Sequence, residues 1–336
     1  MNDQREIFDR RVLRRHRDRA APGIAAHDFL FREVAERLLD RLEDVRRRFP
    51  LALDLGCHHG VVAELLAGRG SIETLVQADL SPAMTRLAAA RGAACGMGGL
   101  AAPALVADEE ALPFAEGSLD LVLSVLSLHW VNDLPGTLLQ IARALKPDGL
   151  LLAAMIGGDS LRELREALLR AELEVEDGVS PRVSPLADLR DLGGLLQRAG
   201  FALPVVDVDS LTVTYPSALA LMRDLRGMGE TGTDRNRRRG LTRRATLLRA
   251  AALYEEAHGD AAGRIPASVD ILYLTGWAPH AAQPQPLRPG SARTRLAEAL
   301  GSAERSAGEK AGGEESGGGK PGAQHPDGGA KKGGKP

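Results

Sequence analysis

The chain has 336 residues, of which 44% are hydrophobic, 26% are charged and only 3% are aromatic. Few aromatic side chains argue against a stacking surface for single-stranded nucleic acid, and a formal net charge of -2 lacks the basic excess of a nucleic-acid-binding protein. Two cysteines, Cys57 and Cys95, exclude a disulfide framework or four-thiolate zinc site and favour a reducing compartment. The longest apolar runs, residues 119–128 and 149–156, are too short to cross a bilayer.

Residues 1–48 form an N-terminal segment with a helical pattern. Its arginines, from Arg5 to Arg19, are interspersed with acidic residues, and no apolar stretch or small-residue cleavage site follows them. We therefore interpret the segment as part of the mature protein and its charges as the solvated face of a helix. A nucleic-acid-binding arm is the alternative.

Alternating apolar runs and helical patterns predict a doubly wound α/β domain over residues 49–215. The predicted strands are residues 51–55, 74–78, 104–107, 119–125 and 150–156, followed by a helix over 189–199 and a strand over 205–215. Nearly continuous apolar strands separated by helices indicate a parallel sheet covered on both faces.

The C-terminal part divides into three predicted segments. Residues 216–268 hold helical patterns that suggest a substrate cap inserted before the last strand, and residues 269–300 contain that strand and the end of the domain. Residues 301–336 contain no aromatic or β-branched residue. We expect this Gly-, Lys- and Glu-rich tail to be disordered, because it cannot bury enough apolar surface to offset the entropy of ordering.

A glycine-containing turn directly follows the first predicted strand. The run Leu53-Asp54-Leu55-Gly56-Cys57-His58-His59-Gly60 precedes a helix, so its backbone N–H groups and the positive helix end can approach a ligand. A metal site at His58 and His59 is a poor alternative, because adjacent side chains seldom converge on one ion and no cysteine cluster accompanies them.

Acidic and polar residues end the next three strands. Asp79, followed by Leu80, lies where a carboxylate can accept both hydroxyls of a ribose. Asp108 and Glu109 precede Leu112-Pro113-Phe114, which suits an adenine amino group and its ring. Ser127 follows the fourth strand. All of these residues lie at the carboxyl ends of parallel strands, where open α/β sheets bind ligands.

With these motifs the chain resembles the class I S-adenosylmethionine (SAM)-dependent methyltransferases. The resemblance implies a Rossmann-like, mostly parallel seven-stranded sheet with SAM as cofactor. It places Gly56 and Gly60 at the methionine portion, Asp79 at the ribose and Asp108 at the adenine, with Asp54, Cys57, Leu80, Glu109 and Ser127 completing the cofactor site. His58 departs from the family, which usually has glycine there, and a histidine either crowds the cofactor or changes the path of the loop.

A longer set of segments is similar to one subfamily. Residues 7–10, 49–57, 107–110, 126–135, 157–161, 180–185, 191–193, 222–230 and 271–277 resemble the mitochondrial complex I assembly factor 5 family. The resemblance implies arginine hydroxylation on the iron-sulfur subunit beside the quinone site of complex I. It also implies peripheral association with the assembling complex, in a bacterial cytoplasm near the inner face of the membrane or in the mitochondrial matrix of a eukaryote. Ordinary methyl transfer, to a protein or to an acyl-carrier carboxyl group, and a noncatalytic assembly chaperone are the alternatives.

Two residues are candidates for catalysis. His129, at the end of the fourth strand, can act as a base or orienting group, or be a packed wall residue. Glu230, in the turn Gly227-Met228-Gly229-Glu230, can clamp a guanidinium through two hydrogen bonds, or be a solvated loop residue. Trp130 is read as a lid or core residue, and Asp159 as a helix N-cap or substrate contact. Residues 235–244 supply arginines for an exposed face or an acidic partner.

Overall fold

The computed structural model describes residues 6–66, 69, 71–94, 101–176, 178–284, 298, 300 and 301. Contacts divide the chain into Met1–Gln283 and Pro284–Pro336, and every element below belongs to the first unit. Cys95 and nearly all of the predicted tail lie outside the described residues. Within the described residues, no helix is long and apolar enough to span a membrane.

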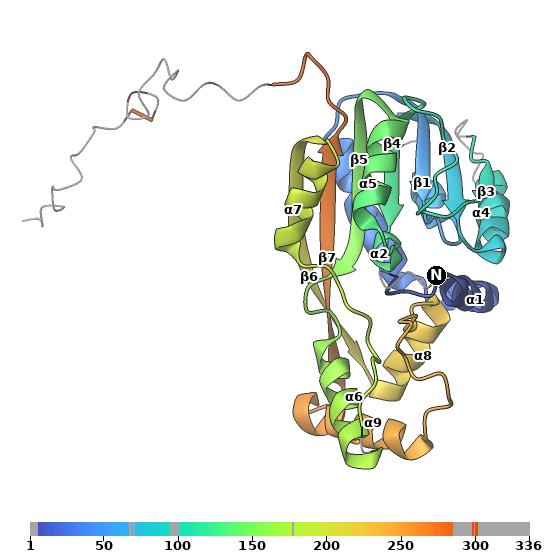
Figure 1. Cartoon of the computed structure of the whole chain (residues 1–336), viewed down its shortest axis with the longest axis vertical. Coiled ribbons are helices and arrows are strands. Elements are labelled where there is room, and N and C mark those ends of the chain that lie inside the picture. Colours follow the sequence, from blue (N-terminus) through green and yellow to red (C-terminus); the bar gives the residue numbers. More distant parts are fainter. Residues whose placement is uncertain are drawn as a thin grey trace, which may run out of the picture. The chain divides into compact units, whose positions relative to one another are not determined.

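The first unit is built on a seven-stranded sheet in the order β3-β2-β1-β4-β5-β7-β6 (Figure 1). All neighbouring strands are parallel except those that pair with β7, which runs antiparallel to both β5 and β6. The strands are β1 (Phe49–Leu55), β2 (Ile72–Asp79), β3 (Ala104–Val106), β4 (Leu119–Val125), β5 (Leu145–Gly157), β6 (Ala202–Tyr215) and β7 (Ile265–Trp277). The α/β fold class expected from the sequence is confirmed.

Helices cover both faces of the sheet, as the fully apolar strands require. On one face lie α2 (Phe29–Glu43), α3 (Val61–Leu65) and α4 (Pro82–Ala94), and on the other lie α5 (Leu134–Ala144) and α7 (Leu189–Arg198). Successive side chains of β4 alternate between the two cores, since Leu121 and Leu123 join the first while Val122 joins the second. The carboxyl ends of β1, β2 and β4 therefore remain free to carry polar groups.

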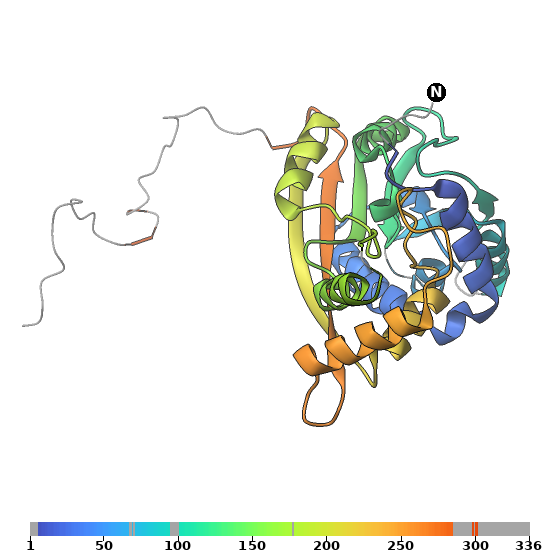
Figure 2. The same cartoon turned by 60° about the horizontal axis from the view of Figure 1, so that its bottom comes forward.

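The cap is larger than the predicted insertion. It contains α8 (Ala218–Met228) and α9 (Arg244–His258), as expected, but also α6 (Arg162–Val175), which precedes the insertion in the sequence. These helices share an apolar core with the ends of β6 and β7 and lie beyond the sheet (Figures 1 and 2). The last strand begins at Ile265, four residues before the predicted boundary at 269, because β6 and β7 pair past the edge of the other strands.

The N-terminal segment forms α1 (Arg10–Ala20) and the 3-10 turn η1 (Ala21–Ala26). The Asp9 carboxylate caps α1 by accepting from the backbone N–H of Val12. The prediction that all charges of this segment lie on a solvated face is wrong, because one side of α1 carries buried arginines. The side chain of Arg17 is fully buried and that of Arg10 is mostly buried, whereas Arg11, Arg14, Arg15 and Arg19 are exposed.

Candidate functional site

The loop after β1 makes a tight turn that depends on its glycines. Gly56 and Gly60 have φ of +73° and +83°, in the left-handed region that favours glycine. A Cβ at Gly56 would overlap the side chain of Ser127, so the loop packs directly against the end of β4. His58 also has a positive φ, +49°, and its buried ring places Nε2 3.1 Å from the carbonyl oxygen of Val125. The histidine therefore fills space beside β4.

Burial raises the pKa values of two side chains in β1 and its loop, Asp54 and Cys57. Both carboxylate oxygens of Asp54 are buried and have no hydrogen-bond partner among the described residues. Burial, with a smaller contribution from the Asp79 carboxylate, raises the pKa of Asp54 to about 8. Burial also raises the pKa of the Cys57 thiol, so Cys57 is not a reactive thiolate. A cationic ligand group placed beside this unpartnered carboxyl group would favour its ionised form.

Asp79 ends β2 with its carboxylate completely buried. Its Oδ1 accepts from the backbone N–H of Ser81 at 2.7 Å, and its Oδ2 accepts from that of His58 at 3.0 Å. Oδ2 also lies 3.1 Å from Nη1 of Arg17. Leu80, the next residue, packs against the apolar cluster formed by Phe8, Leu13 and Trp130.

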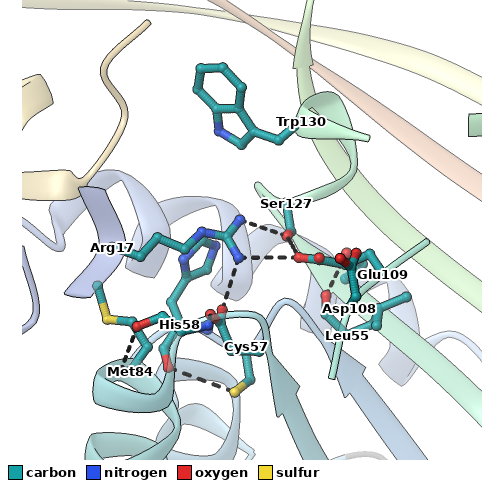
Figure 3. A network of polar contacts seen from close by, with 12 residues as sticks. Arg17, Leu55, Cys57, His58, Met84, Asp108, Glu109, Ser127 and Trp130 are labelled. Atoms are coloured by element: carbon teal, nitrogen blue, oxygen red, sulfur yellow. Dashed lines mark hydrogen bonds and ion pairs between the residues drawn. The ribbon is translucent and has the colours of Figure 1, made fainter. Parts of the chain in front are cut away.

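Glu109, rather than Asp108, is the fully buried carboxylate of the loop after β3. Its Oε1 accepts from the hydroxyl of Ser127 at 2.6 Å and from Arg17 at 3.1 Å (Figure 3). Its Oε2 accepts from Arg10. Burial opposes ionisation, but the two guanidinium groups outweigh it and lower the pKa of Glu109 to about 2. Asp108 is partly exposed and pairs with Arg10 at 2.6 Å.

The sequence reasoning missed Arg10 and Arg17, which join the predicted cofactor residues into one network. Arg17 bonds to Asp79, Glu109 and Ser127, the last at 2.9 Å. These three acceptors come from the ends of three different strands. A signal for them was present, because Arg10, Leu13, Arg17 and Ala20 fall on one face of a helix, and both Leu13 and Ala20 are apolar.

The two predicted catalytic residues lie together. Nε2 of His129, in the 3-10 turn η2 (Leu128–Trp130), is 3.1 Å from Oε2 of Glu230, and the indole N–H of Trp130 donates to the same oxygen at 2.7 Å. All three side chains are buried, so reading Glu230 as a solvated loop residue is wrong. The second carboxylate oxygen, Oε1, is buried without a hydrogen-bond partner among the described residues.

Glu230 lines a cavity of about 630 Å³ beneath the cap. Its walls come mainly from apolar side chains of α6, α8 and α9 and of the segment before α7, with His129 and Trp130 on the sheet side. Three arginines, Arg182, Arg223 and Arg226, also line it. The residues predicted to bind cofactor do not line this cavity, so the site has two compartments, a polar one at the strand ends and an apolar one under the cap.

The remaining candidates lie elsewhere. Asp159 is exposed and outside α6, whose N-cap residue is Leu161, so it is not the predicted N-cap. Of the arginines in 235–244, Arg235 pairs with Glu6 and Arg238 with Glu176, which attaches this loop to the body. Among the described residues, no group of three or more His, Cys, Asp or Glu side chains could hold a metal ion.

Comparison with known proteins assigns this arrangement to a family. Residues 53–153 match the model of a methyltransferase domain. The chain is 45% identical over 294 residues to an arginine-hydroxylase NDUFAF5 of Danio rerio, covering 87% of this chain and 89% of that protein. The human protein of the same name is 44% identical, over 87% of this chain and 83% of its own length. The chain belongs to the NDUFAF5 family.

More distant relatives agree with the fold. A malonyl-[acyl-carrier protein] O-methyltransferase of Methylovorus sp. is 36% identical, over 87% of this chain and 98% of that protein. A putative methyltransferase of Bacillus halodurans superposes with a TM-score of 0.52 at 15% identity, covering 73% of this chain and 99% of that one. This NDUFAF5 family member is therefore a methyltransferase-fold enzyme with S-adenosyl-L-methionine as its cofactor.

The residues present fit that cofactor. The unpartnered Asp54 carboxyl group would ionise beside a cationic group, and the turn from Gly56 to Gly60 presents backbone next to it. Asp79 ends β2, and Asp108 lies just after the neighbouring strand β3. When bound, SAM carries an electrophilic methyl group on a sulfonium sulfur. The individual contacts of Asp54, Gly56, Gly60, Asp79 and Asp108 with the cofactor stay predictions, as do those of Cys57, Leu80, Glu109 and Ser127.

Proposed function

We propose that this enzyme hydroxylates an arginine side chain of a protein, and that the protein is the iron-sulfur subunit beside the quinone site of respiratory complex I during its assembly. The relatives named arginine-hydroxylase support the reaction. The observation that carries the proposal for this chain is the free Oε1 of Glu230, a buried acceptor at the wall of the apolar cavity. A buried acceptor without a partner is costly, and a guanidinium donor would satisfy it.

The neighbours of Glu230 fix its carboxylate for this role. Trp130 and His129 hold Oε2, so the carboxylate plane is set before substrate arrives and Oε1 remains for the ligand. The His129 N–H that faces Oε2 makes this residue an orienting group for Glu230. In our proposal the arginine enters through the cap, its stem lies along the apolar walls, and its head pairs with Glu230.

Hydroxylation has a defined chemical balance. A C–H bond of the arginine side chain is replaced by C–OH, one atom of dioxygen enters the product, and the other leaves as water with two protons and two electrons from an external reductant. The proposal assigns to this chain's residues the binding and orientation of the guanidinium and the exclusion of water from it.

Methyl transfer to a carboxyl group is the second candidate. The arginines at the cavity, Arg182, Arg223 and Arg226, favour it, because they would attract an anionic substrate. The similarity to malonyl-[acyl-carrier protein] O-methyltransferases also supports it. We propose that the enzyme works where complex I is assembled, in the bacterial cytoplasm near the inner face of the membrane or in the mitochondrial matrix of a eukaryote.

Mass spectrometry of the iron-sulfur subunit tests the proposal. We expect one added oxygen on a single arginine in cells with this protein, lost in a deletion strain and in one carrying Glu230→Gln. Glutamine keeps an acceptor for Trp130 but removes the charge that pairs with guanidinium. Glu255→Gln, at an exposed glutamate of α9, is the matched control and should leave the modification intact. A methyl increment would favour transfer chemistry, and an identical unmodified subunit in all strains would refute the hydroxylation.

A further inference from the structure

Two arginines of α1 engage the three carboxylates that mark the cofactor position. Arg17 contacts Glu109 (Figure 3) and Asp79. Arg10 contacts Asp108 and Glu109. Arg17 is completely buried between the ends of β2, β3 and β4. The helix therefore supplies two positive charges to the compartment that binds a cationic cofactor.

The acceptor capacity of Asp79 leaves little room for a ribose diol. A carboxylate has about four lone-pair positions. On Asp79, backbone N–H groups of Ser81 and His58 use two of them and Arg17 uses a third. Two ribose hydroxyls cannot both donate to this carboxylate while Arg17 stays. Arg17 and the ribose thus compete for the same atoms.

The same helix is connected to the cap. Phe8, just before α1, packs edge-on against Trp130 with ring centroids 5.4 Å apart. The backbone N–H of Asp9 donates to the carbonyl of Thr233 at 2.9 Å, and that of Arg235 donates to Ile7 at 2.9 Å. Residues 233–235, which make these bonds, lie just after Glu230 in the sequence. A shift of α1 would therefore change the packing around Trp130 and the position of the segment that follows Glu230.

We infer that Arg17 of α1 occupies part of the cofactor site in the free enzyme and that SAM binding displaces it from Asp79 and Glu109. The accompanying shift of α1 loosens the contacts of residues 7–9 with Trp130 and with residues 233–235. In the free enzyme the arginines hold the carboxylates paired. The cofactor brings its own positive charge and hydroxyl donors to replace them. This inference rests on the cofactor and is independent of which group the enzyme transfers.

Calorimetry and stopped-flow binding of SAM to Arg17→Gln test the displacement. Without a competing guanidinium the binding-competent state is more populated, so we expect a Kd at least about tenfold lower, with the gain in the association rate. Arg14→Gln, an exposed arginine on the same helix, is the matched control and should change Kd by less than about twofold. A higher Kd with faster dissociation would show that Arg17 is a cofactor contact, and an unchanged Kd would show no competition. Either overturns the inference.

Two further measurements apply even if Arg17→Gln is poorly folded. Arg10→Gln, at the mostly buried partner of Asp108 and Glu109, should lower Kd by a smaller factor, because Arg10 shares only Glu109 with Arg17. In the unaltered protein, hydrogen exchange of residues 8–13 and 231–235 should become faster when SAM saturates the enzyme. Slower exchange in both segments would mean that α1 closes over the cofactor with its contacts intact, and would contradict the displacement.

Discussion

The strand ends, where we predict the cofactor, and the cavity under the cap differ in how their acidic side chains are paired. At the strand ends, Asp79, Asp108 and Glu109 all pair with arginines from α1, and Ser127 completes the network. In the cavity, Glu230 has one oxygen held by Trp130 and His129 and one left free among apolar walls. At the strand ends the acidic groups already have arginine partners, whereas Glu230 pairs with no arginine among the described residues, although Arg182, Arg223 and Arg226 line the same cavity. A ligand must therefore displace protein groups in one and can enter the other directly.

The largest expected effect comes from removing Arg17 from the ion network at the strand ends. Arg17→Met should lower the free energy of unfolding by about 3–5 kcal/mol, because removing one partner of a buried ion network leaves uncompensated charges on Asp79 and Glu109. Urea denaturation followed by circular dichroism measures it. Arg14→Met on the exposed side of α1 should stay within about 0.5 kcal/mol. Equal losses in the two variants would show that the network contributes nothing specific.

The ribose assignment of Asp79 gives a binding effect of intermediate size. Asp79→Ala should weaken SAM binding by about 1.5–3 kcal/mol, the range for hydrogen bonds to a charged group. In an Arg17→Gln background the loss should be larger, because Arg17 no longer competes for the carboxylate. Calorimetry of both single variants and the double variant measures the coupling. Unchanged affinity in a folded Asp79→Ala protein would remove the assignment.

Asp54 offers a pH-dependent way to probe the same compartment. Its pKa, raised to about 8, means that the folded state keeps a proton that the unfolded chain releases. The stabilisation from that proton is complete below the unfolded pKa near 3.9 and is lost as pH rises toward 8, by at most about 1.4 kcal/mol per unit. Asp54→Asn should therefore flatten the decline of stability between pH 5 and pH 8, as measured by urea unfolding. A parallel decline in both proteins would contradict this origin.

The sequence was sufficient for the sheet and for the polar residues at its strand ends. The apolar runs set the strands, and the spacing from Asp54 to Asp79 to Asp108 placed carboxylates at one edge of a parallel sheet. It was insufficient for Arg17 and for α6 as part of the cap. Both depend on packing between segments far apart in the chain, and local charge alternation around Arg17 looks the same in a solvated helix. The pairing of His129 with Glu230, 101 residues apart, was not predicted either, although both residues were candidates for catalysis.

The smallest effect should come from removing the predicted tail. Ending the chain after Leu300 removes residues 301–336, a segment without aromatic or β-branched side chains. Since such a composition has almost nothing to contribute to a core, we expect the unfolding free energy and the SAM affinity to change by less than about 0.5 kcal/mol. Differential scanning calorimetry with and without SAM measures both. If the melting temperature of the shortened protein fell by several degrees only in the presence of SAM, the tail would contribute to cofactor binding, and the expectation that it plays no part would be wrong.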